Sequence, residues 1–378
     1  MKWCKSFFFV FCFVFASSGF AEPPKLDDLK KLVLFLQNEI FAHGSSDEWS
    51  RWAVKNSYVS EKENFSWSNY YCKDWRFEEE DLTLEVCNQA LQLFRRKQGI
   101  ERWDQEDLSF ISDQGRLTEL LDDVGVRAKI SNIADSGAKY DWAIIPGGAL
   151  FRVESRINCL SELYSNKQVE KFIVAGADRV LSKVDKKDEL LSGITNHEVE
   201  QVLYGSVEKY IKTEMDGMFF MAMLMLEPDF DCSSTTQAAA YCRSPQTATD
   251  WRNHVLRDLV CQELINKSCQ PVSDRPAKKM TMQVSYAQGR DGNRATTKDN
   301  VAAICNDNPD IAAKKLALLS TQPHAHYQEE IFKKEFNKMT NRKKVDITVF
   351  ALPIDDRILV IEQLNAVHQW LQESLSSS

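Results

Sequence analysis

The fold class of this 378-residue chain can be judged first from the stretch Asp141-Trp142-Ala143-Ile144-Ile145-Pro146-Gly147-Gly148. It is a short apolar run that ends in two glycines, and a helical pattern over 150–164 follows it. A second short apolar run, 171–176, comes directly after that helix and ends in Gly176. Short buried strands that alternate with helices are typical of βαβ units and of a parallel sheet.

The same alternation continues toward the C-terminus. Three further strands are predicted at 280–286, 316–321 and 345–352, with helices at 297–305, 327–339 and 357–375. Because crossovers between parallel strands are right-handed, this order predicts an α/β fold with a doubly wound, mostly parallel Rossmann-like sheet. We assign this domain to residues 136–378.

Two helical regions accompany the predicted sheet. An N-terminal region, 22–135, has helical patterns at 26–40, around Trp49 and Trp52, at 78–96 and at 108–124, and whether it is a separate domain is left open. An insertion at about 183–279 has a helical stretch, 198–226, with a methionine-rich run, and it also contains four cysteines. Such a run favours adaptable core or lid packing over a metal site. The insertion is expected to cover a pocket.

The N-terminus has the pattern of a cleavable secretory signal peptide, residues 1–21. Lys2 and Lys5 precede the apolar run 7–15, and the small residues Gly19 and Ala21 predict cleavage before Glu22. The run is shorter than the roughly 20 residues of a membrane anchor, and no later segment is apolar enough to span. We therefore expect an exported protein, periplasmic or secreted, without a stable transmembrane anchor.

Export gives the cysteines a role. Of the ten cysteines, all except Cys4 and Cys12 lie in the expected mature chain. An even number in an oxidising compartment favours disulfides, and the candidate pairs are Cys72/Cys87, Cys232/Cys242 and Cys261/Cys269. Cys159 and Cys305 fall on core-facing helices, where buried free thiols are equally expected. A zinc cluster is disfavoured because the chain has no CxxC pair.

The net charge of −8 argues against binding of a nucleic-acid polymer, which needs clustered Lys and Arg. It leaves room for a local basic site for an anionic small molecule. In an open α/β sheet such a ligand binds beyond the carboxyl ends of the strands, at the switch point. Four predicted strand or helix ends carry suitable residues there.

At the first, Gly147 and Gly148 open a helix with Arg152 and Arg156, where backbone amides and a helix N-terminus favour an anion. At the second, Asp178 and Arg179 leave a strand together, and a mutual ion pair is the alternative to ligand contact. The third and fourth supply further polar residues: Arg294, Thr296, Thr297 and Asn300, then Ser320, Thr321, His324 and His326.

These residues suggest a chemistry. An anion would lie against Gly147, Gly148, Arg156, Thr296 and Thr297, and His324 would act as general acid or base with Asp178 or Glu198 as its partner. The chain has neither GxGxxG nor a P-loop nor a GxSxG elbow, so no cofactor is identified and a serine hydrolase is disfavoured. A metal site on His324 and His326 is disfavoured because alternate residues of an extended segment face opposite sides.

The four segments resemble the YdcF/SanA/ElyC-like family of bacterial envelope-associated proteins, defined largely as a domain of unknown function. The resemblance covers about 140–352, outside the insertion, and its pattern is carried by Gly147, Gly148, Arg156, Gly176, Thr296, Thr297, Asn300, Ser320, Thr321 and His324. Two departures are Ala177-Asp178-Arg179, which replaces a second glycine, and Gln328, which stands where the pattern has an arginine.

Two classes of function follow. The resemblance implies a domain that binds a phosphorylated or nucleotide-like anion in cell-envelope polysaccharide metabolism, and whether it is an enzyme stays open. The alternative is a non-catalytic secreted interaction protein or effector on the same scaffold, because the insertion, the cysteines and the aromatic N-terminal region suit a surface for protein partners.

Overall fold

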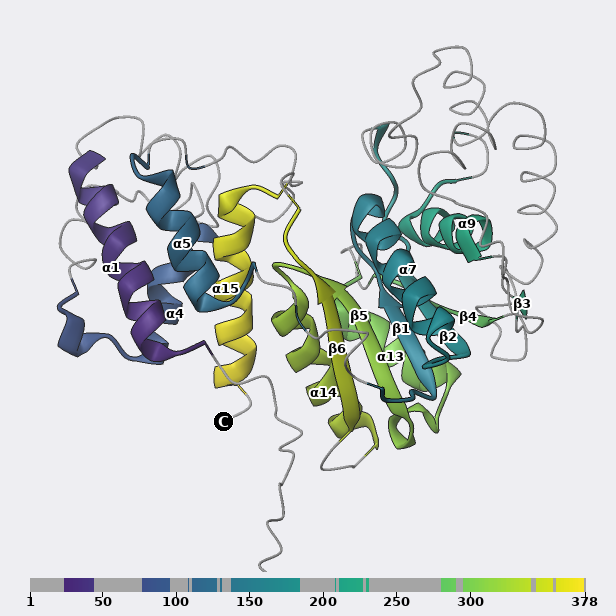
Figure 1. Ribbon diagram of the computed structural model, residues 1–378. Coiled ribbons are helices and arrows are strands. Elements are labelled where there is room, and N and C mark those ends of the chain that lie inside the picture. The colour runs from purple at the N-terminus through teal and green to yellow at the C-terminus, as the bar shows by residue number, and fades with distance from the viewer. Residues whose placement is uncertain are drawn as a thin grey trace, which may run out of the picture.

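The computed structural model describes residues 24–43, 77–95, 108, 111–127, 130, 137–183, 208, 211–226, 229–230, 280–289, 295–340, 345–355 and 358–376. Its centre is a six-stranded sheet in the order β3-β4-β2-β1-β5-β6, and every strand pair is parallel (Figure 1). The strands are β1 (Trp142–Pro146), β2 (Lys171–Ala177), β3 (Asp229–Phe230), β4 (Thr281–Ala287), β5 (Lys315–Thr321) and β6 (Asp346–Leu352). The five predicted strands are confirmed, and β3 is a short addition at the edge.

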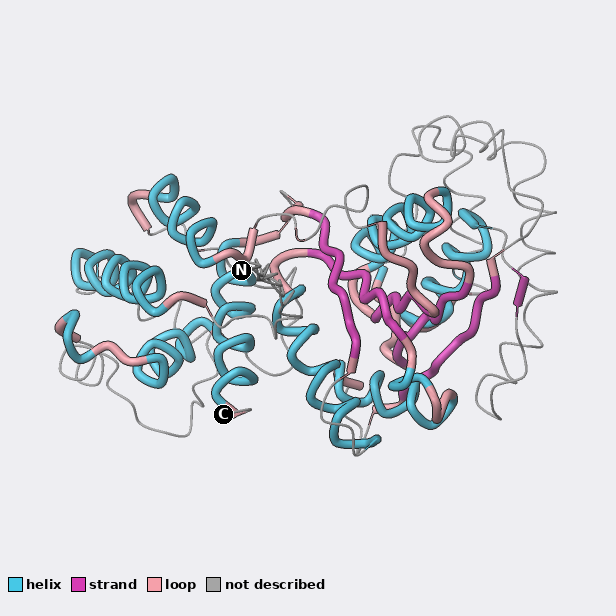
Figure 2. Tube along the Cα trace, turned by 60° about the horizontal axis from the view of Figure 1, so that its bottom comes forward, coloured by secondary structure: helices cyan, strands magenta, loops and turns pink. Residues whose placement is uncertain are grey.

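Helices cover both faces of the sheet, as Figure 2 shows for the strands drawn in magenta. On one face α7 (Leu150–Ser165) and α9 (Glu214–Leu226) share a core with the strands, and on the other α13 (Thr297–Asp307) and α14 (Ala325–Thr340) do so. A short 3-10 turn, η6 (Ile311–Ala313), leads into β5. The Rossmann-like prediction is therefore confirmed.

The strand order fixes where a ligand site is expected. From β1 the chain crosses by α7 to β2 on one side, whereas β5 pairs with β1 on the other side. The crossover direction reverses at this point, so the carboxyl ends of β1 and β5 form the switch point of the sheet. The residues that follow these two strands are Gly147 and Gln322.

A separate group of helices lies beside the sheet (Figure 1). It consists of α1 (Leu26–His43), α4 (Leu84–Leu91) and α5 (Gln114–Val124), with the 3-10 turns η1 (Glu79–Asp81) and η2 (Gln92–Phe94). The final helix, α15 (Val360–Leu375), packs against α4, η2 and α5, and its residues Leu364, Val367 and Leu371 are buried in the same core as α1. We call α1, α4, α5 and α15 the helical unit.

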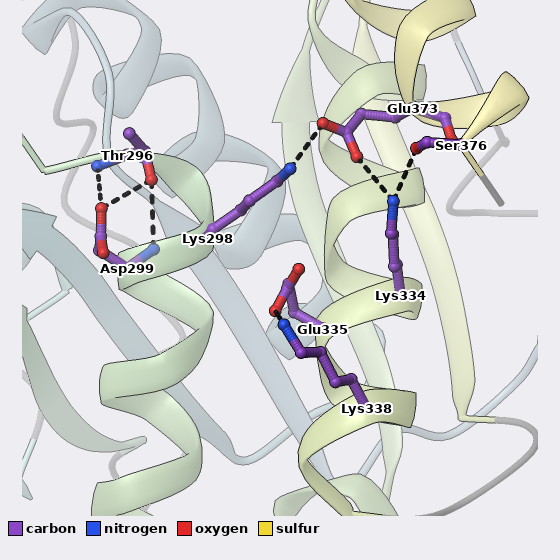
Figure 3. A network of polar contacts seen from close by, with 8 residues as sticks. All are labelled: Thr296, Lys298, Asp299, Lys334, Glu335, Lys338, Glu373 and Ser376. Carbon is purple, nitrogen blue, oxygen red and sulfur yellow. Dashed lines mark hydrogen bonds and ion pairs between the residues drawn. The ribbon is translucent and has the colours of Figure 1, made fainter.

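The helical unit is tied to the sheet through α15. Glu373 of α15 accepts from Lys298 of α13 at 2.8 Å and from Lys334 of α14 at 3.5 Å (Figure 3). Lys334 also donates to Ser376 at 2.6 Å. His326 of α14 stacks on Trp370 of α15, with ring centroids 4.1 Å apart. The last helix therefore belongs to both parts of the molecule.

Helix boundaries differ from the predictions where a side chain caps the backbone. The single helix expected at 78–96 is divided, because Thr83 accepts from the Val86 N–H and starts α4 there. The helix expected from 108 begins at Gln114, since Asp113 caps it, and it ends at Gly125 with φ of 91°. Within the described part of the stretch 198–226, α9 begins at Glu214, and Asp216 accepts from the N–H groups of Lys212 and Thr213 just before it.

The cysteine and methionine predictions have separate outcomes. Cys87 is a buried free thiol, so the predicted Cys72/Cys87 disulfide is wrong; Cys87 faces the helical core with no exposed surface. Cys305 is also a buried free thiol, and Cys159 is buried. The other candidate pairs, and Cys72 itself, lie outside the described residues.

The methionine-rich run is part of the core in its described residues. Met215 and Met218 pack over Gly176, where their sulfur atoms would lie within about 3 Å of any added Cβ.

Among the helices described here, none has both the length and the apolar character required to cross a membrane.

Candidate functional site

Arg156 joins the ends of the two strands at the switch point. Its Nη1 donates to the carbonyl oxygens of Pro146 and Gly147, and its Nη2 donates to Thr321 Oγ1 at 3.1 Å. The side chain comes from the second turn of α7 and is only 1% exposed. The guanidinium therefore fixes the distance between the carboxyl ends of β1 and β5.

The two glycines after β1 are required by close neighbours. A Cβ on Gly148 would lie 3.2 Å from Nη1 of Arg156, and a Cβ on Gly147 would clash with Oε1 of Glu214. The space beside both glycines is thus filled by charged side chains. This explains Gly147-Gly148 by the close approach of protein groups to the backbone, whereas the sequence suggested the approach of an anion.

A second arginine lies on the same face of α7. Arg152 donates from Nη2 to Oε1 of Glu362 at 2.8 Å, and both side chains are less than a tenth exposed. The same carboxylate oxygen lies 3.5 Å from Nε2 of His324, whose side chain is 16% exposed. Arg152, Glu362 and His324 therefore form a chain of contacts from α7 through α15 to the end of β5. We call these three residues together with Arg156 the switch-point cluster.

Electrostatics sets the charge state of the switch-point cluster. Burial lowers the pKa of Arg156 to about 9, and the charge of Arg152 acts in the same direction against that of Glu214. Burial acts to raise the pKa of Glu362, but Arg152 and His324 outweigh it and hold that pKa well below its usual range. Burial also lowers the pKa of His324; the hydrogen bond to Glu362 opposes this shift, and Arg152 and Arg156 add to it. Near neutral pH the carboxylate is therefore ionised and the imidazole is neutral.

Arg179 and Asp178 are not paired with each other. Arg179 donates from Nε to Oε2 of Glu214 at 2.8 Å, and both groups are buried. Asp178 instead accepts from the N–H of Gly289, at 3.2 and 3.3 Å to its two oxygens, and so ties β2 to the end of β4. The partner of His324 is thus Glu362 and not Asp178, because α15 brings its carboxylate to the imidazole.

The predicted residues at the start of α13 act mainly as a helix cap. Thr296 and Asp299 form a capping box in which each side chain accepts from the other residue's backbone N–H (Figure 3). Thr297 makes a hydrogen bond with Tyr327, which acts against the burial that raises the Tyr327 pKa to about 12. Asn300 is buried, and its Oδ1 has no partner among the described residues. The contacts described for these residues do not reach the switch-point cluster.

The remaining predicted residues divide between core and undescribed chain. Ser320 donates to Gln328 Oε1 at 2.6 Å, and both residues are buried. Gln328 therefore has a structural partner at the position where the family pattern has an arginine. Glu198 and Arg294 lie outside the described residues.

The two histidines after β5 face different surroundings. His324 contacts Glu362, whereas His326 stacks on Trp370 in the contact between α14 and α15. Within the part of the chain that the structure describes, no group of three or more His, Cys, Asp or Glu side chains is placed to hold a metal ion.

Two carboxylates of the site were missed from the sequence, Glu362 and Glu214. The signal for Glu362 is the polar content of a helix that is buried almost all round: Gln363, Asn365 and His368 are also buried. Polar side chains on a helix without a solvent face need hydrogen-bonding partners. The periodicity of the sequence does not show which residues those partners are.

Comparisons with models of protein families, with curated proteins and with solved structures find no match to this chain. The candidate site therefore rests on its own geometry.

Proposed function

We propose that this chain is an exported α/β protein of the YdcF/SanA/ElyC-like kind that binds an anionic ligand, phosphorylated or nucleotide-like, at the carboxyl ends of β1 and β5. A role in cell-envelope polysaccharide metabolism is part of this proposal. The anion would bind at the switch-point cluster, with the charges of Arg152 and Arg156 as its attraction.

The observation that carries the proposal is an excess of buried positive charge at the switch point. Arg152 is matched by Glu362 and Arg179 by Glu214, but Arg156 has no ion pair among the described residues. A buried charge without a partner is costly, and an anionic ligand would offset that cost.

Unused hydrogen-bond donors support the same conclusion. The Nε–H groups of Arg152 and Arg156 are buried and have no acceptor among the described residues. Guanidinium groups bind phosphate and carboxylate oxygens through parallel N–H donors. Two guanidinium groups with an open donor each, on successive turns of α7, suit an oxyanion.

The first experiment is a thermal-shift screen of the chain from Glu22 with inorganic phosphate, nucleotides, sugar nucleotides and isoprenyl phosphates. A ligand at 100 times its Kd stabilises the folded state by about 2.7 kcal/mol. We expect at least one phosphorylated compound to raise the Tm, and Arg156→Gln to remove that shift when each variant is compared with its own ligand-free Tm. Arg152→Gln provides a second test if Arg156→Gln does not fold.

The matched control is Arg116→Gln. Arg116 forms an exposed ion pair with Glu119 on α5 and is not part of the switch-point cluster, so its variant should keep the full shift. If no compound shifts the Tm, or if Arg116→Gln and Arg156→Gln lose the shift equally, anion binding at this site is wrong. The alternative of a secreted interaction protein would then be favoured.

Export is tested separately. The full chain with its own N-terminus is expressed in a bacterial host, and the periplasmic and medium fractions are sequenced from the N-terminus. A product that begins at Glu22 supports the signal-peptide part of the proposal, and an uncleaved chain in the cytoplasm contradicts it.

A further inference from the structure

The partial exposure of His324 distinguishes it from its neighbours. Arg152, Arg156 and Glu362 are all less than a tenth exposed, whereas the His324 side chain is 16% exposed. Among the described residues, its imidazole contacts Glu362, whose Oε1 lies 3.5 Å from Nε2. The Nδ1 atom is therefore the ring nitrogen that remains for a ligand.

The charge of Glu362 selects the tautomer. A carboxylate that stays ionised is an acceptor only, so the imidazole nitrogen that faces it carries the proton. In a neutral histidine the other nitrogen then has a lone pair. Arg152, at 2.8 Å from the same oxygen, holds the carboxylate in this ionised state and in this position.

We propose that Glu362 is a positioning residue that holds the Nε2–H tautomer of His324, so that Nδ1 is the proton acceptor of the anion site. This inference rests on the proposed function, since the acceptor is useful only if a ligand binds beside it. The arrangement follows the general pattern in which a carboxylate orients a histidine base and stabilises the imidazolium.

The ligand class this implies is a phosphate ester. A water molecule would give one proton to Nδ1 while its oxygen forms a bond to phosphorus. The ester P–O bond breaks on the opposite side of phosphorus, the leaving oxygen takes a proton from solvent water, and Nδ1 returns its proton to solvent. Arg152 and Arg156 would offset the charge of the phosphoryl oxygens, and Glu362 would stabilise the transient imidazolium. The products are an alcohol and phosphate, with no further reactant.

The test is ¹⁵N NMR of the imidazole nitrogens in the chain from Glu22, with the His324 signals assigned by comparison with His324→Gln. We expect the Nε2–H tautomer at neutral pH. In Glu362→Gln, which keeps the side-chain shape and removes the charge, we expect the titration of His324 to move to lower pH. Glu362→Asp should restore it at least in part.

Either of two results would overturn the inference: an Nδ1–H tautomer in the unmodified protein, or a titration that Glu362→Gln leaves unchanged. The first is measured without any substitution, so it holds even if the variant does not fold. The matched control is Glu373→Gln, which removes a buried carboxylate from the other end of α15 and should leave His324 unaffected.

The two proposals fail in different ways. The phosphate thermal-shift assay tests the anion site through Arg156→Gln, and the NMR experiment tests the tautomer through Glu362→Gln. If phosphate raises the Tm of the unmodified protein and of Arg116→Gln but not that of Arg156→Gln, the anion site is supported, whichever tautomer His324 has. The expected tautomer without any phosphate shift would contradict the proposed function and leave the Glu362–His324 pairing intact.

Discussion

At the residue scale, the switch-point cluster shows how one buried arginine replaces several backbone contacts. Pro146 is the last residue of β1 and Gly147 follows it, and Arg156 donates to the carbonyl oxygens of both. The same guanidinium reaches Thr321 across the sheet. One side chain on α7 therefore holds together the ends of β1 and β5, two segments that are far apart in the sequence.

Replacing Arg156 by Ala should lower the free energy of unfolding by about 3 kcal/mol. The substitution removes the Arg156 donors from the buried carbonyl of Pro146, the part-buried carbonyl of Gly147 and the buried hydroxyl of Thr321, and each lost contact costs on the order of 1 kcal/mol. Urea denaturation measures the change. Thr321→Val removes only one of the three contacts, so a loss as large as that of Arg156→Ala would contradict this assignment.

Acid should destabilise the protein through His326. Burial lowers the pKa of His326 to about 4, whereas the hydrogen bond to the Gly125 backbone acts in the opposite direction. In the unfolded chain this histidine has a pKa of about 6.5 and binds the proton more readily. Stability is therefore complete above pH of about 6.5 and falls progressively toward pH of about 4, by about 2 to 3 kcal/mol.

The test of this pH dependence is His326→Phe, which keeps an aromatic ring against Trp370 and removes the titrating group. Chemical denaturation at a series of pH values should give a shallower acid loss in His326→Phe than in the unmodified protein. Parallel curves for the two proteins would show that His326 does not carry this dependence.

At the element scale, the turn after β1 is shaped by α9 as well as by α7. Glu214 begins α9, and its carboxylate both pairs with Arg179 and occupies the space next to Gly147. Gly148 has a looser fit beside Arg156. The strand-to-helix turn is therefore matched to a residue far along the chain.

This geometry predicts unequal costs for two similar substitutions. Gly147→Ala should destabilise by about 1 to 3 kcal/mol because Glu214 must move from Arg179, and Gly148→Ala should cost less. Thermal or urea unfolding gives both values. In Glu214→Ala the further cost of Gly147→Ala should shrink, and an unchanged cost in this double-mutant cycle would rule out the clash.

The sequence predicts helices and strands well where local periodicity determines them. It predicts poorly the features that depend on contacts with distant segments. The strands and the helices after them have strong periodicity. Gly147, Gly148 and His324 follow from their places after strand ends, and Arg156 follows from its place on the helix after the glycines. Glu362 does not, because its role depends on how α15 lies against α7 and β5. The division at Thr83 depends on one side-chain cap, which competes with a continuous helical pattern.

At the scale of the whole molecule, α15 links the helical unit to the sheet. Its apolar residues lie in the helical core, while Glu362 and Glu373 contact α7, α13 and α14. Because α15 follows the last strand in the sequence, the sequence alone assigns it to the sheet domain. Its apolar residues gave no sign that they pack against the N-terminal helices, because contacts between distant segments leave no periodic signal.

Removal of residues 358–378 should therefore affect more than the deleted helix. α15 has 16 residues, and its loss exposes apolar residues of α4 and α5, the helices against which α1 packs. We expect far-UV circular dichroism to lose clearly more helical signal than those 16 residues account for. A loss limited to the deleted helix would show that the N-terminal helices fold by themselves. The milder variant Leu364→Ala should cost about 2 to 5 kcal/mol.

The pairing of β1 with β5 has a consequence for how the chain is made. β1 lies between β2 and β5, a strand that is synthesised much later, and the core that contains α1 also needs α15. Contacts between distant segments form slowly because a long loop must close first. The sheet is incomplete before β6 has been synthesised and the helical core before α15 has, so the early helices expose apolar surface until then. We therefore expect the nascent chain to depend on chaperones, and a ribosome stalled before residue 360 to carry a chain that proteases cut readily.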